Sequence, residues 1–343
     1  MSAYLRPIDN YMPHHIGKTC LLMAVAALAA HPQTFTTLVD FNGANGANPR
    51  YESLVQGLDG RLYGTTSGGG SSLNLGTVFA VTPQGQLTTL KSFADYDGSG
   101  HPDAGLIVLP DGTLYGTAST DGTRGFGTVF QIAPSGTLTT LFNFDSADGA
   151  NPFAGLAQGT NGTLYGTTWR GGANDAGAIF QITLGGRFTP LHSFDRTDGG
   201  YPYAGLLQAA NGLLYGTTFY GGAYENGAVY LINQNGTYSV VHSFGLADGR
   251  GPAGGLVEYD GGSLYGTTQA GGANGYGTVF QLNPYGPLIT LFSFDKTHGA
   301  YPLGALVQGS DQNFYGTTAG GGVNGQGTIF QISPGYADHT AQL

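Results

Sequence analysis

Residues 204–230 read AGLLQAANGLLYGTTFYGGAYENGAVY, and close copies of this stretch recur through the chain. The Tyr-Gly-Thr triplet returns after 52 residues once and after 50 residues four times, starting at Tyr63, Tyr115, Tyr165, Tyr215, Tyr265 and Tyr315. Two further aromatic positions keep nearly the same step: one is Phe79, Phe130, Phe180, Tyr230, Phe280 and Phe330, and the other is Phe41, Phe93, Phe144, Phe194, Phe244 and Phe294. Self-similarity at a fixed period of this length indicates six copies of one structural unit.

Each unit contains four short segments with the composition of β-strands, separated by turn residues. In the third unit we expect these strands at residues 154–158, 164–168, 178–183 and 188–194. Asn161-Gly162 between the first two can form a tight hairpin, since both residues tolerate positive φ. Turns such as Pro134-Ser135-Gly136 join the third strand to the fourth. Glycine-rich loops make the other two connections, so each unit is predicted to be a four-stranded antiparallel meander.

Neighbouring positions inside these strands are both apolar, as in Leu164-Tyr165 and Ile179-Phe180, so both faces of each small sheet need cover. Sheets packed face to face around an axis provide it, which predicts an all-β fold, a six-bladed β-propeller of four-stranded antiparallel blades. The chain opens with a strand of the fourth type, residues 35–41, and its sixth unit stops after the third type, residues 328–332. We therefore expect the N-terminal strand to pair with the last blade and close the ring.

The composition suits such a fold and narrows the choice of partners. Glycine makes up 62 of 343 residues and charged residues only 9%, a turn-rich and helix-poor mixture. The formal charge of -10, with only 11 Lys and Arg, argues against nucleic acid and anionic membranes as partners. The single Cys20 excludes an intramolecular disulfide and a cysteine-based zinc site.

Residues 1–30 have the features of a secretory signal peptide. Basic residues precede an apolar run at residues 21–28, and Ala27-Leu28-Ala29 offers the small residues of a cleavage site. The alternative is a short buried helix before the first strand. The run is too short to span a bilayer, so no membrane span is expected in the mature chain. We expect a propeller over residues 31–334, a short C-terminal tail at 335–343, and secretion to the extracellular space or the periplasm.

The repeated unit resembles a known family, the GloVer-type tandem repeat of secreted bacterial proteins. The resemblance rests on a phrase made of Ala204-Gly205-Leu206, Leu214-Tyr215-Gly216-Thr217-Thr218, Gly221-Gly222-Ala223 and Gly227-Ala228-Val229-Tyr230, and it extends over about residues 34–334. It implies an extracytoplasmic repeat protein, without an established activity for particular residues. Members often carry a C-terminal sorting signal that this sequence does not show, so we expect release and not surface anchoring.

Connections alternate between the two ends of a meander, so the tight turns share one face of the disc and the glycine-rich loops the other. We expect binding on this long-loop face, where the units differ from one another. After Tyr-Gly-Thr-Thr, the third and fourth units carry Trp169-Arg170 and Phe219-Tyr220, and nearby loop positions add Tyr201, Tyr203 and Tyr224. Aromatic faces beside planar hydrogen-bonding groups suit a sugar ring or a protein partner. The alternative is that these rings only cover the loops beneath them.

A second hypothesis is a polysaccharide-active enzyme, a lyase or a glycoside hydrolase. Its catalytic carboxylates would be Asp198, Asp248 and Glu258, near the mouth of the central channel. The acidic residues of the loops between units could also bind Ca²⁺ or attract a cationic partner, unless each simply caps its own turn. His192 and His242 are expected on the outer rim, exposed and far from the channel. No spacing of His and carboxylates predicts another metal site, and no cofactor is expected.

The sequence therefore favours a secreted binding or interaction protein that holds a glycan or an extracellular protein on its long-loop face. Enzyme activity is the less favoured alternative, because Glu258 is equally consistent with a solvated side chain in a channel lined by glutamines. The tyrosine of the repeated triplet is expected in the core between blades.

Overall fold

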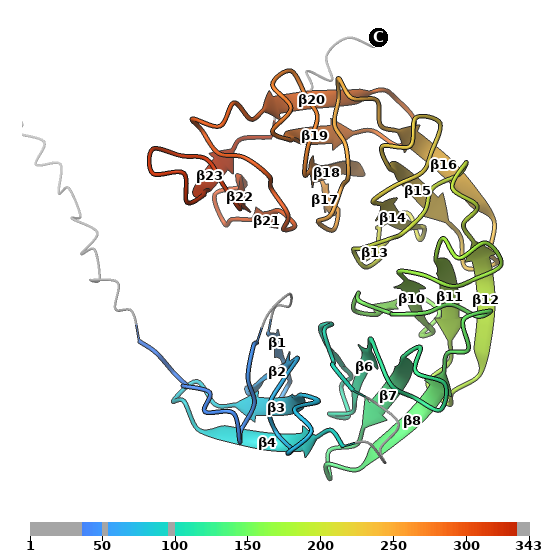
Figure 1. Ribbon diagram of the computed structural model, residues 1–343, viewed down its shortest axis with the longest axis vertical. Coiled ribbons are helices and arrows are strands. Elements are labelled where there is room, and N and C mark those ends of the chain that lie inside the picture. Colours follow the sequence, from blue (N-terminus) through green and yellow to red (C-terminus); the bar gives the residue numbers. More distant parts are fainter. Residues whose placement is uncertain (1–35, 50–53, 95–99, 335–343) are drawn as a thin grey trace, which may run out of the picture. The chain divides into compact units, whose positions relative to one another are not determined.

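Each repeat folds into one antiparallel sheet whose strands lie in chain order, and all six sheets belong to the unit Leu38–Leu343. The structure is a computed structural model that describes residues 36–49, 54–94 and 100–334. Within that unit the sheets follow one another around a common centre, with the first strand of each sheet innermost (Figure 1). The predicted six-bladed, all-β propeller fold is confirmed.

The blades are numbered in chain order. Blades 1 to 3 contain β1 (Val55–Gln56), β2 (Leu62–Thr66), β3 (Thr77–Val81), β4 (Leu87–Ser92); β5 (Ile107–Val108), β6 (Leu114–Ala118), β7 (Thr128–Ile132), β8 (Leu138–Asn143); β9 (Ala157–Gln158), β10 (Leu164–Thr168), β11 (Ala178–Ile182) and β12 (Phe188–Ser193). Blades 4 to 6 contain β13 (Leu207–Gln208), β14 (Leu214–Thr218), β15 (Ala228–Ile232), β16 (Tyr238–Ser243); β17 (Val257–Tyr259), β18 (Ser263–Thr268), β19 (Thr278–Leu282), β20 (Leu288–Ser293); β21 (Val307–Gln308), β22 (Phe314–Thr318) and β23 (Thr328–Ile332).

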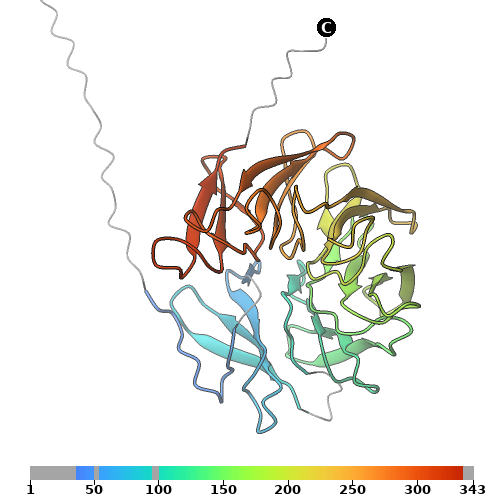
Figure 2. The same cartoon turned by 45° about the horizontal axis from the view of Figure 1, so that its top comes forward.

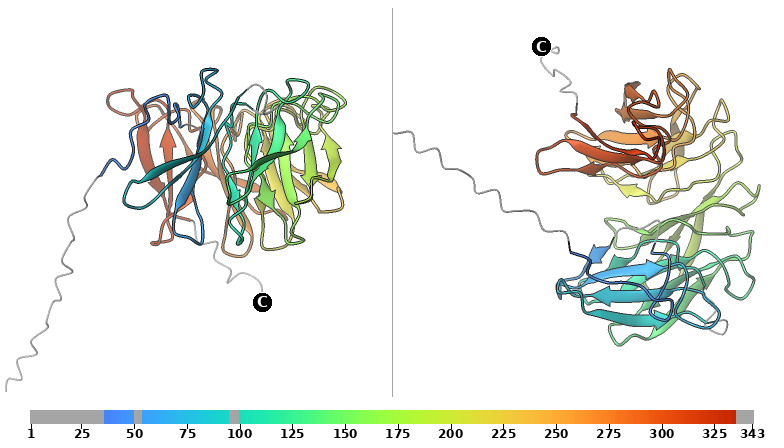
Figure 3. Two further views of the ribbon diagram at one scale, coloured as in Figure 1. Left: turned by 90° about the horizontal axis from the view of Figure 1, so that it is seen from below. Right: turned by 60° about the vertical axis from the view of Figure 1, so that its left-hand side comes forward.

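The connections gather at the two opposite ends of the sheets, as the turned and edge-on views show (Figures 2 and 3). Short turns join the first strand of a blade to the second and the third to the fourth, and we call their side the tight-turn face. The longer loops, from the second strand to the third and from one blade to the next, form the long-loop face.

The innermost strand of each blade is shorter than predicted. In blade 3 only Ala157 and Gln158 pair with β10, whereas the sequence suggested a strand from residue 154. The carbonyl oxygen of Ala154 instead accepts a hydrogen bond from the hydroxyl of Thr117 in blade 2, at 3.1 Å. The start of the predicted strand is therefore bonded to the neighbouring blade and not to its own sheet.

The glycine of Tyr-Gly-Thr makes room for an aromatic ring of the next strand. In blade 2, a β-carbon added to Gly116 would lie 2.7 Å from Cζ of Phe130, closer than two carbon atoms pack. Phe130 is fully buried, as are its counterparts Phe180 and Phe280. Glycine inside a strand often marks such a close approach, and here it allows the ring to lie flat within the blade.

The tyrosine of the triplet lies in the core, as predicted. Tyr165 and Tyr215 are almost completely buried, and only their hydroxyl groups reach the tight-turn face. There Asn161 Nδ2 donates a hydrogen bond to the Tyr165 hydroxyl at 2.9 Å, and the Tyr63 hydroxyl donates to Asp59 at 2.7 Å. The tyrosine thus fills the space between blades and also fixes the turn before it.

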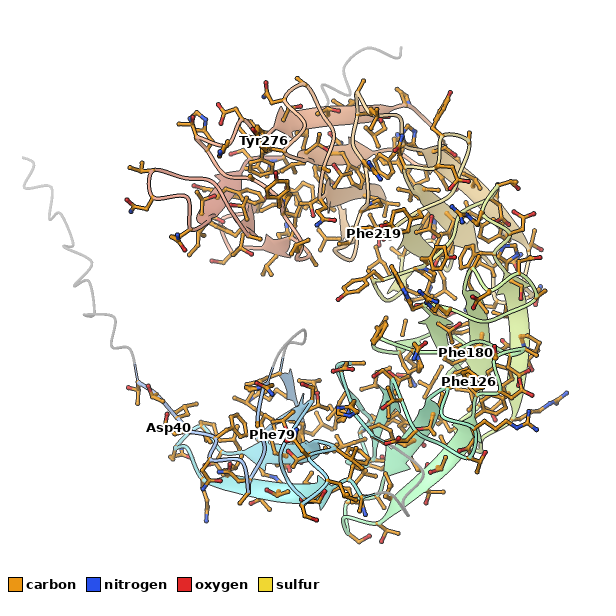
Figure 4. All side chains as sticks on the ribbon, in the orientation of Figure 1. Asp40, Phe79, Phe126, Phe180, Phe219 and Tyr276 are labelled. Carbon is orange, nitrogen blue, oxygen red and sulfur yellow. The ribbon has the colours of Figure 1, made fainter. Side chains whose placement is uncertain are left out.

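Two kinds of contact recur between neighbouring blades. The threonine of the triplet donates to a backbone carbonyl of the following blade, at 3.1 to 3.4 Å, in the pairs Thr65–Ala104, Thr117–Ala154, Thr167–Ala204 and Thr267–Gly304, whereas the Thr217 hydroxyl of blade 4 has no partner among the described residues. The phenylalanine after the outermost strand packs edge-on against a ring of the next blade, with centroids 5.1 to 5.5 Å apart, in the pairs Phe93–Phe130, Phe144–Phe180, Phe194–Tyr230, Phe244–Phe280 and Phe294–Phe330. Figure 4 shows Phe79 and Phe180 inside their blades.

The N-terminal segment forms only one half of the predicted seam. Phe41 packs on Phe79 of blade 1 with centroids 5.2 Å apart, the contact that the other blades receive from their predecessors. The pairing with blade 6 is not formed, since residues 36–42 contain no strand and the sheet β21-β22-β23 has three strands. Ile329 in β23 is 83% exposed, whereas its counterpart Val279 is fully buried. Closure of the ring stays a prediction.

Three predicted features lie outside the described residues: the signal peptide at 1–30, the C-terminal tail at 335–343, and the first residue of the closing strand. In the part of the chain that the structure describes, no helix is long and apolar enough to cross a membrane.

Blade 4 breaks the aromatic pattern with Tyr230, whose buried hydroxyl has no hydrogen-bond partner among the residues described. Burial raises the pKa of Tyr230, so the hydroxyl stays protonated. An unsatisfied buried polar group costs about 1 to 3 kcal/mol. All five other blades have phenylalanine at this position. We predict that Tyr230→Phe raises the free energy of unfolding by about 1 kcal/mol, measured by urea denaturation.

Tyr238→Phe is the matched control for this substitution. The Tyr238 hydroxyl donates to the Asp198 carbonyl oxygen at 2.7 Å, so its removal should lower the free energy of unfolding. If both substitutions destabilise the protein equally, the Tyr230 hydroxyl is hydrogen-bonded in solution and the prediction is wrong.

Ring closure can be tested by hydrogen exchange. If residues 35–41 complete blade 6, the backbone amides of β23 should be protected as strongly as those of β19. Deleting residues 35–41 should then remove this protection and lower the melting temperature, because the contact between Phe41 and Phe79 is lost as well. Fast exchange of β23 in the intact chain, together with an unchanged melting temperature after deletion, would show that the ring stays open.

Candidate functional site

Backbone hydrogen bonds position the residues that follow Tyr-Gly-Thr-Thr on the long-loop face. The amide of Trp169 donates to the Asn151 carbonyl at 3.0 Å, and the amide of Phe219 donates to the Tyr201 carbonyl at 3.1 Å. Each bond holds the end of the second strand against the loop that enters the same blade. Side chains that are far apart in the sequence therefore become neighbours at the same place in every blade.

The loop residue before each repeated proline has a left-handed backbone. Its φ is 55° at Asn151, 56° at Tyr201 and 63° at Gly251. The same conformation is found at His101 (52°) and Tyr301 (60°), so it is a feature of the repeat that is easy for Gly and Asn and strained for a tyrosine. At Gly251 an added β-carbon would lie 3.2 Å from the Phe219 ring, so glycine in blade 5 leaves space for that ring.

Six aromatic side chains of blades 3 and 4 gather around Trp169 and form what we call the aromatic cluster: Phe153, Trp169, Tyr201, Tyr203, Phe219 and Tyr220. The Trp169 ring centroid lies 5.4 Å from that of Tyr201, 5.5 Å from Tyr203, 6.1 Å from Phe219 and 6.5 Å from Phe153. Tyr220 joins through Phe219 at 4.7 Å and Tyr201 at 5.9 Å. Figure 4 shows Phe219 toward the inner ends of these blades.

The rings of the cluster are packed on one side and accessible on the other. Tyr203 is 38% exposed, and Trp169, Tyr201, Phe219 and Tyr220 are half-buried. Partly exposed aromatic faces held by their neighbours provide a rigid apolar surface for a ligand.

Two of the predicted residues lie apart from the cluster. Arg170 is exposed and makes no ion pair or ring contact with another described residue. Tyr224 is 65% exposed and likewise makes no ring contact among the residues described. The guanidinium that does reach the cluster belongs to Arg196, which lies 5.9 Å from the Tyr201 centroid and pairs with Glu225 at 3.0 Å.

Polar side chains of blade 2 occupy the positions that are aromatic in blades 3 and 4. Ser119 donates its hydroxyl to Asp103 Oδ2 at 2.6 Å, and His101 Nδ1 lies 2.8 Å from the Ser67 carbonyl oxygen. Asn151, which also bonds the Trp169 amide, donates its side chain to the Ser119 carbonyl at 3.0 Å. We call the side chains of His101, Asp103 and Ser119 the polar wall. Through Asn151, this polar wall borders the aromatic cluster.

Sequence reasoning missed Phe153 and the polar wall. Their signal is positional, because Asp103 aligns with Phe153 and Tyr203, Ser119 with Trp169 and Phe219, and His101 with Tyr201.

The three carboxylates of the enzyme hypothesis are not brought together. Asp198 Oδ2 lies 2.7 Å from His192 Nε2, and Asp248 Oδ2 lies 2.8 Å from His242 Nε2. These loops turn back onto the outermost strand, so both carboxylates lie at the rim and not at the channel mouth, and both histidines are half-buried instead of exposed. The Glu258 carboxylate accepts a hydrogen bond from the amide of Ala210 at 2.8 Å, on the tight-turn face.

Several of the acidic residues between units cap their own loops. Asp195 accepts bonds from the amide and the hydroxyl of Thr197, and that hydroxyl makes the largest contribution to the lowered pKa of Asp195. The pKa of Asp145 is lowered chiefly by the amide of Asp148, and Asp145 also pairs with Arg124 at 2.7 Å. No three His, Cys, Asp or Glu residues within the described ranges are grouped so that they could hold a metal ion.

Repeated sheets of this kind, with one unit per blade, define a tandem-repeat β-propeller. The chain belongs to the Gloeobacter/Verrucomicrobia repeat family, which matches residues 24–212 and 171–342. No curated protein matches the sequence.

Solved structures share the fold at low sequence identity. PorZ, a surface component of the type-IX secretion system of Porphyromonas gingivalis, is 13% identical with a TM-score of 0.54, and the match covers 86% of this chain and 41% of PorZ. The extracellular domain of a proposed one-component system of B. thetaiotaomicron is 11% identical with a TM-score of 0.52, over 80% of this chain and 32% of that one. A periplasmic gluconolactonase of Pseudomonas aeruginosa is 16% identical with a TM-score of 0.47, over 82% of each chain. This chain thus spans less than half of the first two.

Proposed function

We propose that this protein is a secreted binding protein that holds a glycan on the aromatic cluster of blades 3 and 4. The observation that carries the proposal is the packing of five rings around or beside Trp169, within 6.5 Å of it or of one another. Sugar rings offer apolar C–H faces as well as hydroxyl groups. A partly exposed aromatic surface can stack on such faces without the large desolvation cost of a charged site.

The polar wall supplies the second requirement of a sugar site, hydrogen bonds that fix orientation. Ligand sites typically combine an apolar lining with a few well-placed polar groups. Asp103 and Ser119 already bond each other, and His101 is held through Nδ1 by the Ser67 carbonyl. If Nδ1 carries the proton in this contact, Nε2 is left to accept a bond from a sugar hydroxyl.

The geometry supports binding more than catalysis. Glycosidic cleavage commonly uses two carboxyl groups about 5 to 10 Å apart across the bond. Asp198 and Asp248 are each engaged with a histidine at the rim, and Glu258 bonds a turn on the tight-turn face. These residues serve local structure in three separate places, so the enzyme hypothesis has no assembled centre to rest on.

We predict that Trp169→Ala weakens glycan binding at least tenfold, since it removes the ring that the others contact. Gln269→Ala is the matched control, because Gln269 occupies the same repeat position in blade 5 and lies outside the cluster. Binding would be measured on an array of immobilised glycans and confirmed by calorimetry with the glycans that bind. Gln269→Ala should bind as the wild-type protein does.

Three results would contradict this proposal. One is an array on which no glycan is bound. Another is equal binding by the wild-type protein and Trp169→Ala. The third is release of reducing or unsaturated sugar ends that Glu258→Gln abolishes, which would establish the enzyme instead.

A further inference from the structure

A second surface departs from the repeat, on the tight-turn face between blades 1 and 2. A groove of about 410 Å³ lies there, lined by the turn at residues 57–61, the turn at 110–112, and Ala133-Pro134. Its volume falls in the range of about 300 to 1,000 Å³ that is typical of small-molecule sites. The groove is separate from the aromatic cluster, which lies on the long-loop face of blades 3 and 4.

At three other blade junctions, a hydrogen bond joins the two neighbouring blades on the tight-turn face. The bonds are Gln234 Nε2 to Thr160 Oγ1 at 2.7 Å between blades 3 and 4, Ala210 N to Glu258 Oε2 at 2.8 Å between blades 4 and 5, and Tyr259 Oη to Gln312 Oε1 at 2.9 Å between blades 5 and 6. No such bond joins blades 1 and 2 among the residues that the structure describes. The junction of blades 2 and 3, with Pro110 and Leu184 at the positions of Thr160 and Gln234, has no such bond among the described residues either, and the groove lies at one of these two junctions.

Apolar side chains stand at both positions that form the hydrogen bond between blades 3 and 4. Leu58 occupies the repeat position of Thr160, and Pro134 occupies that of Gln234. Neither side chain can form a hydrogen bond. Leu58 is 86% exposed, and together with Val108 and Pro134 it gives the groove apolar walls.

The charged groups of the groove are unequally paired. Asp59 Oδ2 accepts bonds from Arg61 Nε and from the Tyr63 hydroxyl, both at 2.7 Å. The Tyr63 hydroxyl, followed by Arg61, lowers the pKa of Asp59 to about 2, so this carboxylate and Arg61 neutralise each other. Asp111 accepts the amide of Thr113 at 2.9 Å, and no cation within the described ranges pairs with it. The groove therefore has one carboxylate without a counter-charge.

We propose that this groove binds a small ligand with an apolar body and one protonated amine. The amine lies at Asp111, and the apolar body packs against Leu58, Val108 and Pro134. Charge complementarity favours a cationic ligand, because the lining contains two carboxylates and one guanidinium in a chain of net charge -10. An anionic group of the same size would meet repulsion from Asp111 without a compensating free cation.

Three probes of similar size but different charge test the proposal: 2-phenylethylamine, 2-phenylethanol and 3-phenylpropionate. Their binding to the full chain would be followed by ligand-observed NMR. The amine should bind at least tenfold more tightly than the alcohol or the acid. Asp111→Asn should abolish this preference, whereas Asp311→Asn, at the same repeat position in blade 6, should keep it.

A second variant introduces between blades 1 and 2 the hydrogen bond that joins blades 3 and 4. Leu58→Thr combined with Pro134→Gln installs the Thr160–Gln234 pair of blades 3 and 4, so it should fold normally and weaken amine binding at least tenfold. Trp169→Ala should bind the amine as the wild-type protein does. Equal binding of the three probes to the wild-type protein, or unchanged amine binding by the double variant at an unchanged melting temperature, overturns the proposal.

Discussion

The close contact between a glycine of the second strand and an aromatic ring of the third underlies the whole structure. In blade 3 this ring is Phe180, which lies over Gly166 and also receives Phe144 of blade 2 at 5.3 Å. One side chain thus serves the packing inside a blade and the packing between blades. Every blade has a glycine and an aromatic ring at these two positions, with tyrosine in place of phenylalanine in blade 4, so the ring that meets the preceding blade rests on a contact that tolerates no β-carbon.

This packing constraint applies to the residues that build the blades and not to those of the turns and loops at the surface. The residues that build blades are nearly identical in all units, so they cannot distinguish one side of the ring from another. Trp169 and Leu58 occupy positions outside that framework, in the turns and loops at its two ends. Both candidate sites arise where one or two units replace small or polar residues with large apolar ones while the strands beneath them stay unchanged.

The period of the sequence predicts the strands well but says little about the direction of the loops. In blade 3, β10, β11 and β12 begin at the residues expected from the pattern, because buried positions recur at fixed steps along them. Asp198 was expected near the channel, yet its loop folds back to His192, a pairing decided by loop conformation. The aromatic cluster could be anticipated from Trp169 and Phe219 because they follow the triplet directly, whereas Phe153 and Asp103 depend on how the entering loop packs.

The residue before each repeated proline can vary in this way because two backbone bonds hold its position. At Tyr201 the amide donates to the Ala176 carbonyl at 2.7 Å, and the carbonyl accepts the amide of Phe219 at 3.1 Å. Equivalent amide bonds hold His101, Asn151, Gly251 and Tyr301 at 2.8 to 2.9 Å. With the left-handed backbone fixed by these two bonds, the side chain at that position contributes little to keeping the loop in place. A propeller of this design can therefore place a histidine, a tyrosine or no side chain at equivalent points of one face and keep its fold.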